Sequence, residues 1–240
     1  MSDRAERTAQ LEAYHRDQVA PCVRCPLSDG RTQVVVGDGS LDADVMFVGE
    51  APGYHEDRQG IPFVGQAGKL LTSLLEEIGL RREDVFIANV LKCRPPGNRD
   101  PQPAEISSCE PHLFRQISLI RPRLVCTLGN FATKLLSGRP DGISRVHGHP
   151  LTIEVAGAPV TLYPLFHPAA ALYTRAMLGT LQADFARIPE LIAGAAPPPP
   201  ARAPAPPDPE PVAAGVAAAP IPDPGRAAAP EPAGAQLGLF

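Results

Sequence analysis

The chain has 240 residues and a formal net charge of −4, with 22 basic and 26 acidic side chains. This balance excludes the basic surface of a nonspecific nucleic-acid binder, so any nucleic-acid contact must use a local patch. No stretch of 18 apolar residues occurs and the charged N-terminus lacks a signal-peptide core, so we expect a cytoplasmic protein without a membrane span.

The composition divides the chain into a globular part and a tail. From residue 194 to 235 the sequence is almost only Ala, Pro, Gly and a few charges, and 14 of the 30 prolines lie there. Such a segment buries too little apolar area to offset its ordering entropy. We therefore expect one domain over residues 1–193 and a disordered linker over residues 194–235.

Strand-like and helix-like patterns alternate through the globular part. Short apolar runs predict buried strands at 44–49, 85–90, 123–129 and 160–166. Helical periodicity lies between and after them, at 66–78, 104–120, 130–136 and 178–192. The alternation predicts a single α/β domain with a mainly parallel central sheet flanked by helices.

Each predicted strand is followed by polar or glycine-rich residues. In order, these exits are GEAPG (49–53), Asn89 with KCRPPGNRDP, Leu128-Gly129-Asn130, and His167-Pro168. Ligands of open parallel sheets bind at the carboxyl ends of the strands, so the four exits should converge on one site.

The loop VGEAPGYHEDRQGIPFVGQAGKLL, residues 48–71, is unusually polar for a strand exit, yet it holds Phe63 in its middle. Phe63 could be a hydrophobic plug beneath the loop or a platform for a flat ligand. Asn89 could read the edge of such a ligand because an amide is both donor and acceptor, with His167 nearby. Glu50 brings a carboxylate to the same edge.

Five cysteines in a reducing compartment are not expected to form a disulfide framework. Cys126 lies inside an apolar strand and should be a buried thiol. The other four, Cys22, Cys25, Cys93 and Cys109, could be a redox pair with two incidental thiols, a zinc site or a 4Fe–4S site. Their spacing does not separate zinc from iron–sulfur.

Three motifs with these four cysteines carry a family resemblance. GEAPGYHEDRQGIPFVGQAGKLL, NVLKCRPPGNRDP and FHPAAAL resemble the family 4 uracil-DNA glycosylases over roughly residues 20 to 190. The resemblance implies a 4Fe–4S cluster on Cys22, Cys25, Cys93 and Cys109. This cluster would be structural or would organise DNA-binding loops.

The resemblance also implies hydrolysis of the N-glycosidic bond of deoxyuridine in DNA, during base-excision repair. Phe63 would stack on the face of an extruded uracil, and Gly49 and Ala51 of the GEAPG turn would also bind the substrate. Asn89 would bond the O4/N3 edge, and His167 would donate to O2 as charge grows there.

One departure concerns the attacking water. The better-known family 1 enzymes carry an Asp where this chain has Ala51, so Glu50 becomes the first candidate for positioning the water. Glu56 and Asp57 are reserves, and a carboxylate in this loop could instead only fix the turn. The expected catalytic set is Glu50, Asn89 and His167.

The sequence signals for DNA-binding residues are weaker than those for the active site. Leu172 resembles a minor-groove wedge but could equally start a core helix. Candidate phosphate contacts, any of which could be an ordinary surface charge, are Arg145, His147, Gly148, Lys69 and Arg175.

The chain ends in AQLGLF, an apolar cluster after the linker. Residues 236–240 resemble the peptide by which bacterial proteins bind the replication sliding clamp, with Gln236, Leu237, Leu239 and Phe240 as contacts. A chance apolar terminus is the competing interpretation.

Two other functions remain open at this stage. A noncatalytic iron–sulfur DNA-binding module is one, and a glycosylase acting on other deaminated bases such as hypoxanthine is the other. We expect a monomer that acts on uracil-containing DNA, either single or double stranded.

Overall fold

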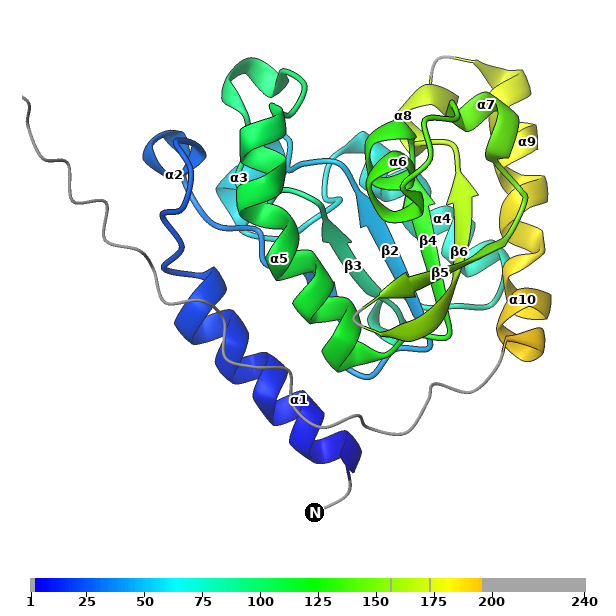
Figure 1. Cartoon of the computed structure of the whole chain (residues 1–240). Helices are drawn as coiled ribbons and strands as arrows, with labels where there is room; N and C mark the ends of the chain where they lie inside the picture. Colours follow the sequence, from blue (N-terminus) through cyan, green and yellow to red (C-terminus); the bar gives the residue numbers. More distant parts are fainter. Residues whose placement is uncertain (1–2, 156, 173, 196–240) are drawn as a thin grey trace, which may run out of the picture. The chain divides into compact units, whose positions relative to one another are not determined.

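The computed structural model describes residues 3–155, 157–172 and 174–195, which all fall within one compact unit. Figure 1 shows a central sheet with helices packed on both faces. The peptide 236–240 and all but the first two residues of the predicted linker lie outside the described residues.

The sheet has six strands in the order β1-β3-β2-β4-β6-β5. Their bounds are β1 Asp38–Gly39, β2 Val45–Gly49, β3 Phe86–Asn89, β4 Leu124–Leu128, β5 Leu151–Val155 and β6 Ala158–Leu165. The four central strands are parallel, and the edge strands β1 and β5 are antiparallel to their neighbours. The predicted α/β class is confirmed.

Helices follow most strands. Their bounds are α1 Asp3–Tyr14, α2 Leu27–Gly30, α3 Tyr54–Gln59, α4 Gln66–Glu77, α5 Pro103–Ile120, α6 Asn130–Ser137, α7 Ile143–Val146, α8 Pro168–Ala171, α9 Arg175–Ala186 and α10 Ile188–Gly194. A π-helical turn, His15–Val19, continues α1, and short 3₁₀ turns occupy Arg82–Asp84 and Pro96–Asn98.

Alternate strand residues feed two hydrophobic cores, one on each face of the sheet. Met46 and Val48 of β2 pack in a core with α1 and α5. Val45 and Phe47 pack in the other core, with α4 and α9. This two-sided burial explains why the strands read as continuous apolar runs.

Two elements differ from the sequence prediction. The helix expected at 178–192 is broken between α9 and α10 at Arg187, because Pro189 cannot donate a backbone hydrogen bond and its ring clashes with the preceding turn. Strand β5 was not predicted, although its residues 151–155 alternate in burial and lead into a tight turn at Gly157.

None of the helices in the described ranges has the length and apolar character needed to cross a membrane.

Candidate active site and cysteine cavity

Asn89 and Gly49 are paired neighbours at the carboxyl ends of β3 and β2. Asn89 is buried, and among the described residues its Oδ1 atom has no hydrogen-bond partner. A Cβ atom on Gly49 would overlap Asn89 Oδ1 and would lie 2.6 Å from Phe63 Cζ. Glycine at this position therefore lets an amide and an aromatic ring meet at the strand end.

Phe63 is held in a conformation that few residues adopt. Its φ is 53°, in the left-handed region, and its side chain is only 8% exposed. The guanidinium of Arg82 donates a 3.1 Å hydrogen bond to the Phe63 carbonyl and another to the Pro62 carbonyl. Gly68 allows α4 to pass directly over the Phe63 backbone, where any Cβ would overlap it. Such strain persists only where the surroundings impose it.

His167 lies two residues after the end of β6 and faces the same ring. The His167 and Phe63 ring centroids are 5.6 Å apart at 31°. The backbone N–H of Ala169 donates to His167 Nδ1 at 3.1 Å, which leaves Nε2 to carry the proton of the neutral imidazole. Burial lowers the His167 pKa to about 4. The ring is thus a neutral donor at physiological pH.

The three carboxylates of the loop have different surroundings. Glu50 is half-buried, and its pKa is raised by burial and by the nearby Asp100. Glu56 accepts hydrogen bonds from two consecutive backbone N–H groups of the loop, at residues 64 and 65, both 2.9 Å long. Asp57 is buried and accepts from the Thr32 N–H at 2.9 Å. Glu56 and Asp57 therefore fix the loop, while the Glu50 carboxylate has no hydrogen bond or ion pair within the described residues.

The structure brings Phe63, Asn89 and His167 to one edge of the sheet, with Glu50 and Ala51 in the next two positions after Gly49. Sequence reasoning missed the residues that hold Phe63. Gly68 left a signal, because an isolated glycine within a helical pattern often marks a close backbone approach. Arg82 left none, since it is 19 residues away from Phe63 in the sequence.

The residues expected to contact DNA differ in how exposed they are and in whether they already have a partner within the fold. Leu172 follows α8 and is 43% exposed, so it does not start a core helix. Arg145 is exposed, 4.0 Å from Asp141. His147 Nδ1 lies 2.8 Å from Asp184 Oδ2, so its first partner is a carboxylate within the fold.

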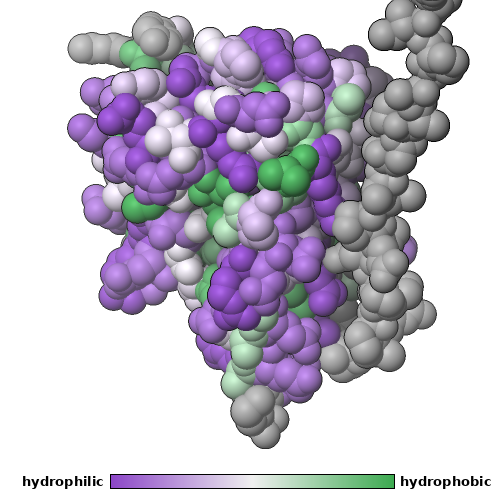
Figure 2. Space-filling model, turned by 90° about the vertical axis from the view of Figure 1, so that its left-hand side faces the viewer, coloured by the Kyte–Doolittle hydropathy of each residue, from purple (hydrophilic) through white to green (hydrophobic). Residues whose placement is uncertain are grey.

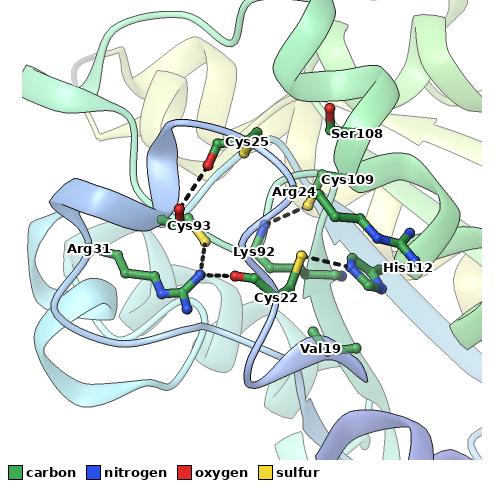
Figure 3. A pocket seen from close by; sticks show the side chains of 11 residues that line it. Val19, Cys22, Arg24, Cys25, Arg31, Lys92, Cys93, Ser108, Cys109 and His112 are labelled. Carbon is green, nitrogen blue, oxygen red and sulfur yellow. Dashed lines mark hydrogen bonds between the residues drawn. The ribbon is translucent and has the colours of Figure 1, made fainter. Parts of the chain in front are cut away.

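A second site is a cavity lined by the four predicted cysteines (Figure 3). Cys22 and Cys25 come from the loop before α2, Cys93 from the exit of β3, and Cys109 from α5. Cys126 is fully buried in β4, away from this cavity, as its sequence context predicted.

Nitrogen donors surround the cysteine sulfurs. The Arg31 guanidinium donates to Cys93 Sγ at 3.4 Å, and the Lys92 N–H donates to Cys109 Sγ at 3.3 Å. His112 Nε2 lies 3.3 Å from Cys22 Sγ. Burial raises the pKa of the Cys109 thiol to about 11, and burial also raises the Cys93 pKa. Within the ranges described, no three His, Cys, Asp or Glu side chains converge as ligands of a single metal ion.

Lys92 connects the two sites. Its side chain is fully buried, and Nζ donates to the Asn89 carbonyl at 2.8 Å and to Gln116 Oε1 at 2.6 Å. Burial lowers the Lys92 pKa to about 8. The same residue thus fixes the backbone of Asn89 through its side chain and contacts Cys109 through its backbone.

Comparison with known proteins identifies the family. The model of the uracil DNA glycosylase superfamily matches residues 36–189. The type-4 uracil-DNA glycosylase of Saccharolobus solfataricus is 46% identical over 182 residues, 74% of this chain and 84% of that protein. The type-4 enzyme of Archaeoglobus fulgidus is 46% identical over 184 residues, 75% of this chain and 92% of that protein.

A type-5 uracil-DNA glycosylase, from Pyrobaculum aerophilum, is less similar. It is 32% identical over 146 residues, which make up 55% of this chain and 63% of that protein. The chain therefore belongs to the uracil DNA glycosylase superfamily and, within it, to the type-4 uracil-DNA glycosylases.

Proposed function

We propose that this protein hydrolyses the N-glycosidic bond of deoxyuridine in DNA, releasing uracil and leaving an abasic site for base-excision repair. The type-4 relatives are named for this activity. The observation that carries the proposal for this chain is the unpartnered Oδ1 of buried Asn89, beside Phe63 and His167.

The Asn89 amide supplies base selection. Its Oδ1 atom accepts the N3–H of uracil, and its Nδ2 donates to uracil O4. Cytosine has no N3 proton and places an amino group at C4, so both bonds fail. Each buried group left unpaired costs about 1–3 kcal/mol, which is roughly 5- to 150-fold in selectivity.

His167 stabilises the departing base. Breaking the glycosidic bond places negative charge on uracil O2, and the proton on His167 Nε2 is the donor that meets it. The neutral ring is held ready by the Ala169 N–H on Nδ1, so no reorganisation is needed as the charge develops. One preorganised donor of this kind contributes about 10²–10³-fold in rate.

Phe63 and Glu50 act on the two other parts of the substrate. Once the uracil has left the duplex, the Phe63 ring stacks on its face and holds it in the site. Glu50 positions the water that adds to the sugar C1′, because the loop's other two carboxylates are occupied by backbone N–H groups. An oxocarbenium-like sugar needs little base strength from Glu50.

The residues of the cysteine cavity fit a 4Fe–4S cluster. Four thiolates are the usual ligand set of such a cluster, and N–H donors to sulfur are typical of its surroundings. Arg24, Arg31 and Lys92 also line the cavity and offset the thiolate charge. The choice of a cluster over zinc rests on the resemblance of the four-cysteine pattern to the type-4 enzymes.

When bound, this cluster supplies a rigid cross-link between the loop before α2, the exit of β3 and α5. Cys22, Cys25, Cys93 and Cys109 would hold it. None of the four cysteines is among the residues proposed to hydrolyse the glycosidic bond.

Leu172 is proposed to enter the minor groove of DNA, and Arg145 to contact phosphate; the exposure of both side chains supports these roles. His147 is proposed to act with them, although its Nδ1 faces Asp184. The enzyme is proposed to work as a monomer, on single- or double-stranded DNA.

A sliding clamp is the proposed partner of residues 236–240. The linker would raise the local concentration of the enzyme on clamp-bound DNA. Deleting residues 236–240 should abolish binding of the full chain to purified clamp, and equal binding by the full and shortened chains would contradict the proposal.

The activity is tested on an oligonucleotide with a single deoxyuridine, by alkaline cleavage at abasic sites. Parallel substrates carry cytosine, thymine or hypoxanthine at the same position. Cleavage at deoxyuridine alone is expected. A noncatalytic DNA-binding module would bind all four and cleave none, and a broader glycosylase would also release hypoxanthine.

A further inference from the structure

We propose that Tyr54, Arg58 and Arg94 form a binding site for an unpaired nucleotide of the DNA strand beside the extruded deoxyuridine. These three residues are called the Tyr54 platform below. The inference rests on the proposed function, because it names where the substrate strand runs next to the active site.

The Tyr54 platform is an exposed ring with two cations over it. Tyr54 begins α3 and is 50% exposed, which is unusual among the large apolar side chains of the described residues. The guanidinium carbon of Arg94 lies 5.2 Å from the ring centroid and that of Arg58 lies 5.8 Å from it. Arg94 is oriented by a 2.6 Å hydrogen bond from Nε to Asn98 Oδ1.

The two guanidinium groups retain their charge for a ligand. Within the part of the chain that the structure describes, neither Arg58 nor Arg94 forms an ion pair with a carboxylate. Other exposed arginines of this acidic chain do so, such as Arg16 with Asp17 and Arg81 with Glu83. Two unpaired cations beside one ring are therefore a local positive patch of the kind that a phosphate backbone requires.

The platform is close to the active site in the fold. Tyr54 directly follows the GEAPG turn at the exit of β2, and Arg94 directly follows Cys93 at the exit of β3. Leu172 and Arg145 lie on the other side, after β6 and before β5. Because β3 and β6 flank the β2–β4 pair, a strand whose base enters at Asn89 can extend across both sides.

The surroundings favour a nucleic acid over an apolar protein partner. Figure 2 shows the face of the molecule on the side of α2 and α3, and this face is mainly hydrophilic with small, scattered apolar areas. An aromatic ring next to cations matches the way proteins hold single strands, with a base stacked on the ring and guanidinium groups on phosphates. A stacked base must be unpaired, so the platform should favour single-stranded or locally opened DNA.

The test measures binding by fluorescence anisotropy, with the full-length protein and single-stranded oligonucleotides that carry 2′-fluoro-deoxyuridine. The fluorine slows cleavage because it destabilises positive charge on the sugar. Tyr54→Leu should weaken binding about 10-fold, whereas Tyr54→Phe, which keeps the ring, should stay within about twofold. Arg58→Ala should lower the salt slope of log K by about 0.7, the value for one phosphate contact on a single strand. Arg81→Ala, an exposed arginine before β3, is the charge-matched control and should not lower it.

Length dependence separates a nucleotide contact from a structural role. With 2′-fluoro-deoxyuridine 3′,5′-bisphosphate, which has no neighbouring nucleotide, Tyr54→Leu and Tyr54→Phe should bind equally. A Tyr54→Leu defect of the same size on this short ligand, or no defect on the long one, would overturn the proposal. If the wild type binds the oligonucleotide through Tyr54 yet releases no uracil from ordinary deoxyuridine, the proposed activity fails and the platform stands.

Discussion

The substitution Gly49→Ala tests the geometry at the end of β2 and β3. Gly49 has ordinary extended backbone, so alanine introduces no conformational strain there and acts only through its methyl group. That methyl would lie 2.6 Å from Phe63 Cζ and would overlap Asn89 Oδ1, whereas ordinary contacts begin at 3.4 Å. The ring or the amide must therefore retreat by about 0.8 Å, because Arg82 and Gly68 hold the Phe63 backbone in place.

A displacement of about 1 Å in a substrate-positioning group costs about 100-fold in rate. We expect Gly49→Ala to lower the single-turnover rate of uracil release by about that factor, measured by rapid quench with enzyme in excess. Gly179→Ala is the matched control, since its methyl meets nothing within 4 Å and it lies in helix α9. Circular dichroism and thermal melting show whether each variant folds. A folded Gly49→Ala enzyme with the wild-type rate would refute the assigned geometry.

Three further results are expected. Glu50→Gln should slow turnover without abolishing it. Because burial raises the Glu50 pKa, the wild-type rate should fall as the pH drops through that raised value. The variant should lose this acid limb in a pH–rate profile. His167→Ala should lower the single-turnover rate about 10²–10³-fold at pH 7. Because the folded His167 pKa is about 4, the wild-type rate should not change through His167 titration between pH 7 and 5, and a limb near 6.5 that vanishes in the variant would contradict the neutral ring. Cys109→Ser should lose the broad absorption at about 400 nm that thiolate-bound iron gives, and it should melt at a lower temperature. Cys126→Ser should keep the absorption. An unchanged spectrum in Cys109→Ser would remove that residue from the ligand set.

The sheet and the place of the site could be predicted from the sequence because both depend on local signals. The four parallel strands are apolar on both faces, and each exit carries its polar group directly after the run, so chain order alone put Asn89 and His167 at one edge. Edge strand β5 is half-exposed and weakly apolar, so its residues give little strand signal. The predicted helix at 178–192 contains Pro189, which ends one helix and starts another in the fold.

Contacts between distant segments could not be predicted from the sequence. The loop motif ranks Glu50 above Glu56 only because Glu50 is next to Ala51. The fold adds the physical reason, since the Glu56 carboxylate binds the backbone N–H groups at 64 and 65. The left-handed backbone of Phe63 depends on Arg82, which no local pattern connects to it. Lys92 reads as an ordinary surface lysine until burial and Gln116 are seen.

The segment from Asn89 to Arg94 contributes to the active site, to the cysteine cavity and to the Tyr54 platform at once. These six consecutive residues supply the buried Asn89 amide, the Lys92 ammonium that binds the Asn89 carbonyl, a cysteine of the cavity and the Arg94 guanidinium over Tyr54. Cys93 is only four positions after Asn89, so a displacement of Cys93 is transmitted along the backbone directly to the Asn89 amide. We expect oxidation of Cys93 to disturb Asn89 and Arg94 together, because the three residues belong to one short segment of the backbone.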